Sequence, residues 1–206
     1  MTPRTVGILV FPEVEVLDFC GPFEVFSVTR LDDERRRDEP PPYKVVLIAE
    51  SRDIVVATGG LKVVPDLGLD DSPPLDVLVV PGGWGTRREI DNERLIAWIA
   101  GQASQVTTVA SVCTGSLLLG KAGLLHGKRA TTHWRVIHEM RGWFPTVTVI
   151  DDEHVVRDGN VITSEGISAG IDMALRVVAI HHGEAVARAT ARYMEYPIPE
   201  NNRRRI

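Results

Sequence analysis

The sequence is poor in cysteine and in aromatic residues, and it contains no long hydrophobic run. Its two cysteines, Cys20 and Cys113, lie far apart, which argues against a metal-binding pattern or a disulfide framework and favours a reducing compartment. No stretch approaches the roughly 18 consecutive apolar residues of a membrane-spanning helix, so we expect no membrane association. The segment from Met1 to Arg4 leads directly into an apolar run without a signal-peptide core. Together these absences predict a cytoplasmic protein.

Positive charge and phosphate-binding glycine motifs are also scarce. The net charge is -5, which argues against nucleic acid as a partner. The cluster Arg203-Arg204-Arg205 is therefore predicted to be a solvated tail and not a binding arm. The sequence lacks a Gly-x-Gly-x-x-Gly pattern, which argues against dinucleotide binding, and it contains no phosphate-binding P-loop. The length and the 44% hydrophobic content predict one globular domain over residues 1–206.

Apolar runs alternate with amphipathic segments along the chain. The expected strands are Arg4–Val10, Tyr43–Ala49, Asp76–Val80, Val106–Ala110 and Asn160–Thr163, with a hairpin joining Ile54–Thr58 to Leu61–Val64 and short strands within 127–132, 146–150 and 154–156. The expected helices are Gly21–Thr29, Asn92–Ala103, Ser116–Ala122, His133–Met140, Ile167–Ile180 and Glu184–Ala191. Continuous apolar strands alternating with helices predict an α/β fold, in which a mostly parallel sheet is covered on both faces. Ligands bind such sheets beyond the carboxyl ends of the strands.

Cys113 is the strongest candidate for a reactive residue. It follows an apolar strand and precedes a helix, with Ser111 two residues before it and Gly115 two residues after it. This is the spacing of a nucleophile elbow, with cysteine in place of serine. The amides at the helix start are expected to favour a thiolate. The alternative is a free cysteine that packs as a small buried hydrophobe, as we expect for Cys20.

Asp18 is an acid within the apolar stretch Val16-Leu17-Asp18-Phe19. One interpretation is a helix N-cap that binds the amides at the Gly21-Pro22 helix start. The other places Asp18 beside Cys113, where burial and a like charge would help it to hold a proton and act as a general acid.

Three further features follow strands or begin helices. The Gly82-Gly83-Trp84-Gly85 loop could present backbone amides to developing negative charge, together with the amide of Thr114. The Thr114 hydroxyl could lie at the site or cap its helix. His133 could pair with Cys113 or be a structural residue at a helix start.

The sequence resembles the DJ-1/PfpI superfamily over nearly its full length. The segments that carry the resemblance are 6–12, 17–26, 80–83, 111–116, 127–134 and 166–172, and within the superfamily they look most like the isocyanide hydratases. The resemblance implies a flavodoxin-like three-layer sandwich, a homodimer, no cofactor and a small-molecule substrate. It also implies a reaction that adds water to an isocyanide, giving an N-substituted formamide.

The resemblance assigns roles to individual residues. Cys113 matches the nucleophile, Asp18 the acidic partner and Thr114 the residue after the nucleophile, and the three form the predicted catalytic set. The predicted substrate-binding residues are Gly83, Trp84 and Ile167. Gly83 and Thr114 match the backbone donors near the sulfur.

The sequence also departs from patterns within the superfamily. Thr114 stands where protease-like and glyoxalase-like members have histidine, and Asp18 where they often have glutamate, which argues against peptidase, glyoxalase or deglycase activity. Trp84 replaces a small residue and Glu165 interrupts a glycine-rich stretch of the hydratases, so both could reshape the pocket.

Two alternatives to a hydratase stay open. One is a ligand-sensing domain like those fused to AraC-type regulators, although only seven residues follow Pro199 and we expect no DNA-binding domain there. The other is a redox protein in which Cys113 is oxidised.

Overall fold

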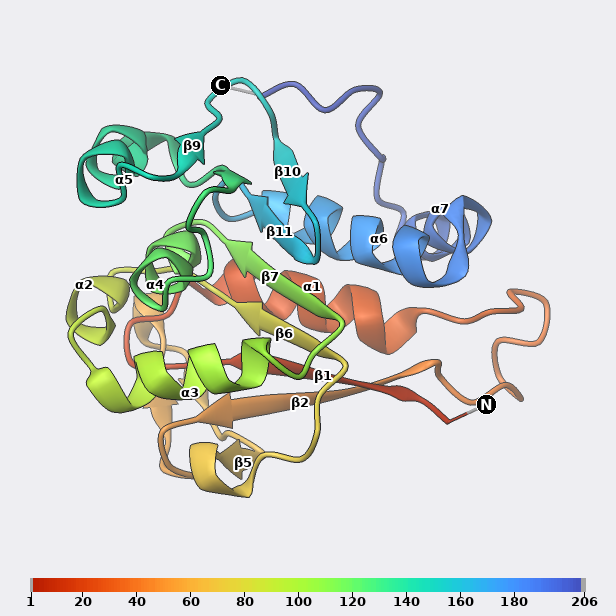
Figure 1. Cartoon of the computed structure of the whole chain (residues 1–206). Coiled ribbons are helices and arrows are strands. Elements are labelled where there is room, and N and C mark those ends of the chain that lie inside the picture. The colour runs from red at the N-terminus through yellow and green to blue at the C-terminus, as the bar shows by residue number, and fades with distance from the viewer. Residues whose placement is uncertain (1, 205–206) are drawn as a thin grey trace.

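A seven-stranded sheet forms the centre of the computed structural model, which describes residues 2–204. The strand order is β10-β11-β7-β6-β1-β2-β5, and every neighbouring pair is parallel except β10 and β11 (Figure 1). The strands of this sheet are β1 (Arg4–Leu9), β2 (Tyr43–Ala49), β5 (Leu67–Gly68), β6 (Val77–Val80), β7 (Thr108–Val112), β10 (Val155–Asp158) and β11 (Val161–Ser164). Two small two-stranded sheets pair β3 (Val55–Val56) with β4 (Lys62–Val63), and β8 (Arg129–Ala130) with β9 (Thr148–Val149).

Helices cover both faces of the main sheet. The helices are α1 (Val16–Val28), α2 (Thr86–Glu89), α3 (Glu93–Ala103), α4 (Gly115–Lys121), α5 (Ile137–Trp143), α6 (Ala169–His182) and α7 (Glu184–Tyr193). Helices α1, α6 and α7 pack together on one face, whereas α3 and α4 lie on the other (Figure 1). The predicted three-layer α/β fold with a mostly parallel sheet is confirmed.

The apolar runs of the sequence become the buried strands. Every residue of β6, β7 and β11 is buried, as expected for central parallel strands that are covered on both faces. The strand Tyr43–Ala49 has the predicted bounds, and the predicted hairpin is present as the antiparallel pair β3 and β4. Helix α3 begins after Asn92, whose side chain accepts a hydrogen bond from the Leu95 amide.

Three predicted helix starts were wrong. Helix α1 begins at Val16 and continues through Pro22, which has no N–H to donate to the Asp18 carbonyl. Helix α6 begins at Ala169 because Ile167 has a left-handed backbone, with φ 58°. The helix expected from His133 is a 3-10 turn at Trp134–Val136 followed by α5. The short elements β5 and α2 carry too few residues for a periodic signal, and the sequence did not reveal them.

No helix within residues 2–204 is both long enough and apolar enough to cross a membrane.

Candidate active site

Cys113 occupies a sharp turn between β7 and α4. Its backbone is left-handed, with φ 57°, and its amide donates a hydrogen bond to the Glu165 carbonyl over 3.0 Å. A non-glycine residue adopts this conformation only at a cost, and such strain is concentrated at functional sites. A Cβ atom on Gly115 would lie 2.1 Å from the Val80 carbonyl oxygen, so only glycine fits after the turn. The elbow geometry that the spacing predicted is therefore present.

Asp18 ties three segments of the chain together at this turn. Its Oδ2 accepts a hydrogen bond from the Gly82 amide (2.8 Å), and its Oδ1 accepts one from the Ile167 amide (3.1 Å). The N-cap interpretation of Asp18 was wrong, because the residue lies within α1 and its carboxyl bonds to two other loops. The β-branched residue Ile167 has a strained, left-handed backbone, and in this conformation its amide donates a hydrogen bond to Asp18.

The two ionisable groups of the site both resist charge. Burial, and to a lesser extent the nearby charge of Glu15, raises the pKa of Asp18 to about 7 against the lowering effect of its hydrogen bonds. Burial is also the largest cause that raises the pKa of the Cys113 thiol, and the charge of Asp18 comes second. The expectation of a resting thiolate was wrong, because burial outweighs the amide and hydroxyl of Thr114. Thiol and carboxyl thus form one buried pair in which a proton on either group makes it easier to ionise the other.

Thr114 organises the glycine loop after β6. Its Oγ1 accepts hydrogen bonds from the Gly83 amide (3.0 Å) and from the Thr86 hydroxyl (3.1 Å). The capping interpretation of Thr114 was wrong, because its side chain caps no helix amide. The amides of Gly82 and Gly83 donate to Asp18 and Thr114, so within this loop these two amides are already engaged.

A pocket of about 330 Å³ opens above the elbow. Five of the six predicted site residues line it together, namely Cys113, Thr114, Gly83, Trp84 and Ile167, and the sixth, Asp18, lies behind them. Cys113 is only 6% exposed, but it reaches the pocket wall. The sequence did not reveal the other lining residues, Glu15, Arg87, Trp134, Arg135 and Val136, although Trp134 and Arg135 directly follow the candidate His133.

His133 also lines the pocket, but its ring is engaged elsewhere. Its Nδ1 accepts a hydrogen bond from the Arg135 amide over 3.3 Å, which is the helix-start role that the structural interpretation expects. Burial, followed by the charge of Arg135, lowers the pKa of His133. Within residues 2–204 no hydrogen bond joins His133 to Cys113.

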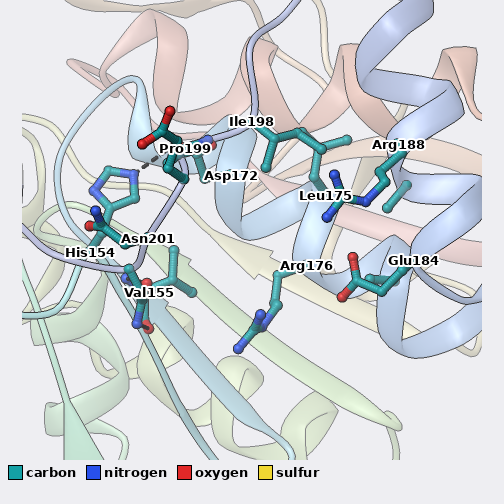
Figure 2. Close-up of a pocket in the computed structure, with 14 residues that line it drawn as sticks. His154, Val155, Asp172, Leu175, Arg176, Glu184, Arg188, Ile198, Pro199 and Asn201 are labelled. Carbon is teal, nitrogen blue, oxygen red and sulfur yellow. Dashed lines mark hydrogen bonds and ion pairs between the residues drawn. The ribbon is translucent and has the colours of Figure 1, made fainter.

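A second buried ionic cluster lies behind the loop that carries Ile167. The Nδ1 atom of His154 lies 2.5 Å from Oε2 of Glu165. Its Nε2 atom lies 2.7 Å from Oδ2 of Asp172, the contact that Figure 2 shows. Both ring nitrogens can donate only if the ring is a cation. Oδ2 of Asp172 also accepts a hydrogen bond from the Tyr196 hydroxyl. The cluster borders a separate pocket of about 270 Å³ between α6, α7 and residues 198–202.

Arg204 completes this second cluster. Its Nη1 atom lies 2.7 Å from Oε1 of Glu165, and its Nη2 donates to Thr131 and Thr132, whose own hydroxyl donates to the Cys113 carbonyl. The prediction of a solvated tail was wrong for Arg204, whose side chain is 9% exposed, because a buried carboxylate is available to it. Arg203 is exposed, and Arg205 lies outside the described residues.

No group of three or more histidine, cysteine, aspartate or glutamate side chains in the described part of the chain is arranged to hold a metal ion.

Comparison with known proteins adds a family to this geometry. The isonitrile hydratase of Pseudomonas putida is 40% identical over 196 residues, which cover 94% of this chain and 79% of that protein. A transcriptional regulator of Pseudomonas aeruginosa, the HTH-type protein GbdR, is 34% identical over 142 residues, but the match spans 69% of this chain and only 38% of the regulator. The crystal structure of a ThiJ/PfpI family protein from Pseudomonas syringae superposes with a TM-score of 0.84 at 33% identity, covering 98% of this chain and 79% of that one. Residues 4–180 match the DJ-1/PfpI family, and the chain belongs to that family.

Proposed function

We propose that the protein is a cysteine-dependent hydratase that adds water to an isocyanide and releases an N-substituted formamide. The observation that carries the proposal is that Cys113 lines the pocket with the buried Asp18 directly behind it, in a chain 40% identical to an isonitrile hydratase. A strained nucleophile beside a carboxyl group with a pKa near 7 suits proton transfer at neutral pH.

The reaction begins with a neutral thiol. Ionised Asp18 removes the Cys113 proton as the sulfur forms a bond to the terminal isocyanide carbon. The proton then passes from Asp18 to the same carbon, which gives a thioimidate, R–N=CH–S–Cys113. The oxygen of water adds to this carbon, and one water proton reaches the nitrogen. The C–S bond then breaks as the hydroxyl oxygen forms the C=O bond, and the remaining proton passes to the sulfur, which releases R–NH–CHO and restores the thiol. A carboxyl group that is half ionised near pH 7 can serve in both directions of proton transfer.

Thr114 and the pocket walls support these steps. The amide and hydroxyl of Thr114 both lower the pKa of the Cys113 thiol, so they stabilise the sulfur as its negative charge develops. Gly83, Trp84 and Ile167 form the walls that hold the substituent of the isocyanide.

A formamide-production assay with an aryl isocyanide tests the proposal, because the chain offers a matched control cysteine. We expect Cys113→Ala to abolish turnover while its circular dichroism and melting temperature stay close to wild type. Cys20→Ala should keep most of the activity, because Cys20 packs against the core outside the pocket. Equal activity of wild type and Cys113→Ala would reject the nucleophile, and an inactive wild type would reject the hydratase.

A second candidate is a ligand-sensing domain without turnover, and the similarity to GbdR favours it. This candidate predicts that isocyanides or formamides bind to the pocket and quench tryptophan fluorescence while no formamide accumulates. Glyoxalase, deglycase and redox-sensing functions rank lower, because Thr114 and Asp18 differ from the glyoxalase-like pattern and burial raises the pKa of Cys113.

We also propose that the protein acts in the cytoplasm as a homodimer on a small molecule, without nucleic acid. Exposed apolar side chains on and beside the β3–β4 hairpin, including Ile54 (59%) and Val64 (69%), offer a surface for a second copy. Light scattering should give twice the 22.7 kDa chain mass. A mass of one chain at micromolar concentration would contradict the dimer.

A further inference from the structure

Two exposed tryptophans flank the pocket above Cys113. Trp84 precedes α2 and is 60% exposed, and Trp134 begins the 3-10 turn before α5 and is 49% exposed. They come from segments 50 residues apart in the sequence, but both line the same pocket. Exposed indole rings that gather at one opening provide flat apolar surfaces on which a planar ligand can stack.

Each of these tryptophans holds an arginine at the same opening. The guanidinium carbon of Arg87 lies 4.5 Å from the ring centroid of Trp84, and that of Arg135 lies 4.9 Å from the ring centroid of Trp134. Neither arginine forms an ion pair within residues 2–204, whereas the adjacent Arg88 pairs with Glu89 and Glu13. Stacking therefore orients two guanidinium groups at the pocket while leaving their charge available to a ligand.

The remaining charged groups of the pocket set the direction in which a ligand enters. Glu15 also lines the pocket, and its charge acts on both Asp18 and Cys113, so it disfavours an anionic group at the reactive end. Arg87 and Arg135 favour such a group at the tryptophan end. Neutral His133 adds no charge to the pocket, and the charge of Arg204 is paired with Glu165. The volume of about 330 Å³ suits a single ring with short substituents.

We propose that the pocket selects a planar aromatic ligand that bears an anionic group opposite its reactive end. This proposal rests on the function proposed above, and it makes the substrate an aryl isocyanide with a carboxylate or similar anion on the ring. The ring lies against Trp84 or Trp134, the anion faces Arg87 and Arg135, and the neutral isocyano group faces Cys113.

The kinetic test compares 4-isocyanobenzoate with 4-isocyanotoluene, which has a similar size but no charge. We expect kcat/KM of wild type to favour the benzoate roughly tenfold at low salt, as two partly exposed charge contacts would give, and less at high salt. Arg87→Ala and Arg135→Ala should each reduce this ratio, and the double variant should bring it close to one. Arg52→Ala removes the same charge from an exposed pair with Asp71 away from the pocket and should keep the ratio.

A binding test separates this inference from the hydratase itself. Cys113→Ala cannot turn over substrate, and quenching of its tryptophan fluorescence should show tighter binding of 4-formamidobenzoate than of 4-formamidotoluene. If wild type hydrates isocyanides but neither test distinguishes the charged from the neutral compound, the inference fails and the hydratase stands. If no isocyanide is hydrated but the charged compound binds more tightly through the two arginines, the hydratase fails and the pocket's selectivity stands.

Discussion

Two buried clusters of ionisable side chains contact the loop from Glu165 to Ile167, and they differ in the partners of their carboxyl groups. In the cluster around His154, the carboxyl groups of Glu165 and Asp172 contact the two nitrogens of the His154 ring, and Glu165 also contacts the Arg204 guanidinium. In the pair of Cys113 and Asp18, the carboxyl accepts hydrogen bonds from the amides of Gly82 and Ile167 and shares a side-chain hydrogen bond with Cys113. Similar burial thus surrounds the carboxyl groups of one cluster with side-chain nitrogen atoms, whereas in the other it raises the pKa of both Asp18 and Cys113.

The difference shows that one cluster holds chain segments together, whereas the pair of Cys113 and Asp18 is suited to proton transfer. In the His154 cluster, breaking a buried pair such as Arg204 and Glu165 is strongly destabilising, so these contacts fix the segments that carry them. A carboxyl without a cation is driven toward its neutral form, and its pKa moves to the range in which proton transfer is useful. The loop between the groups links them, because the Glu165 carbonyl binds the Cys113 amide and the Ile167 amide binds Asp18.

The largest effect is expected in the pH dependence of stability. The folded-state pKa of Asp18 is raised from 3.8 to about 7, so the folded protein binds more protons than the unfolded chain between these values. Stability should therefore fall as pH rises from about 4 to 7, by about 4 kcal/mol from this group alone. Urea unfolding of wild type and Asp18→Asn at pH 4.5 and pH 8 measures the difference. If the free energy of unfolding depends on pH in the same way in both proteins, burial does not destabilise the ionised form of Asp18.

Removal of Arg204 from the cluster around His154 should lower the free energy of unfolding by somewhat less. Arg204→Ala leaves the Glu165 carboxylate buried without its guanidinium, and breaking such a pair costs about 3 kcal/mol. Arg203→Ala, the matched control, removes an exposed arginine next to it and should change stability by less than about 0.5 kcal/mol. The free energy of unfolding of both variants decides the point. Equal losses would mean that the contact of Arg204 with Glu165 adds no more stability than an exposed arginine.

A third prediction separates reactivity toward alkylation from turnover. Asp18→Asn removes the proton carrier and should reduce kcat about 100-fold. The same change removes a charge that raises the pKa of the Cys113 thiol, so iodoacetamide should modify Cys113 faster at pH 8. Glu13→Gln removes a neighbouring exposed carboxylate and should change neither rate appreciably. Slower alkylation of Asp18→Asn would contradict the electrostatic coupling of the pair.

Local patterns predicted the strands and the nucleophile, whereas long-range contacts decided the rest. The apolar run of β2 and the small residues around Cys113 carry their own signal, because strand burial and a tight turn depend on adjacent residues. The bonds of Asp18 could not be predicted in detail, since its partners Gly82 and Ile167 lie 64 and 149 residues away. Arg204 looked like a solvated tail because nothing near it in the sequence indicates Glu165.

Two further features of the sequence indicate contacts that the structure contains. Glu165 directly follows a buried strand and His154 precedes another, and acids and histidines in such places need charged partners. Trp84 and Arg87 are three residues apart at the start of a helix, a spacing that brings side chains together.

Ultraviolet titration of the Cys113 thiolate tests the central claim most directly. The absorbance near 240 nm of wild type minus Cys113→Ala should show no thiolate from Cys113 at pH 7, and should rise only above pH 9.0, the ordinary pKa of a cysteine. A full thiolate signal at pH 7 would contradict a thiol that stays neutral until Asp18 takes its proton.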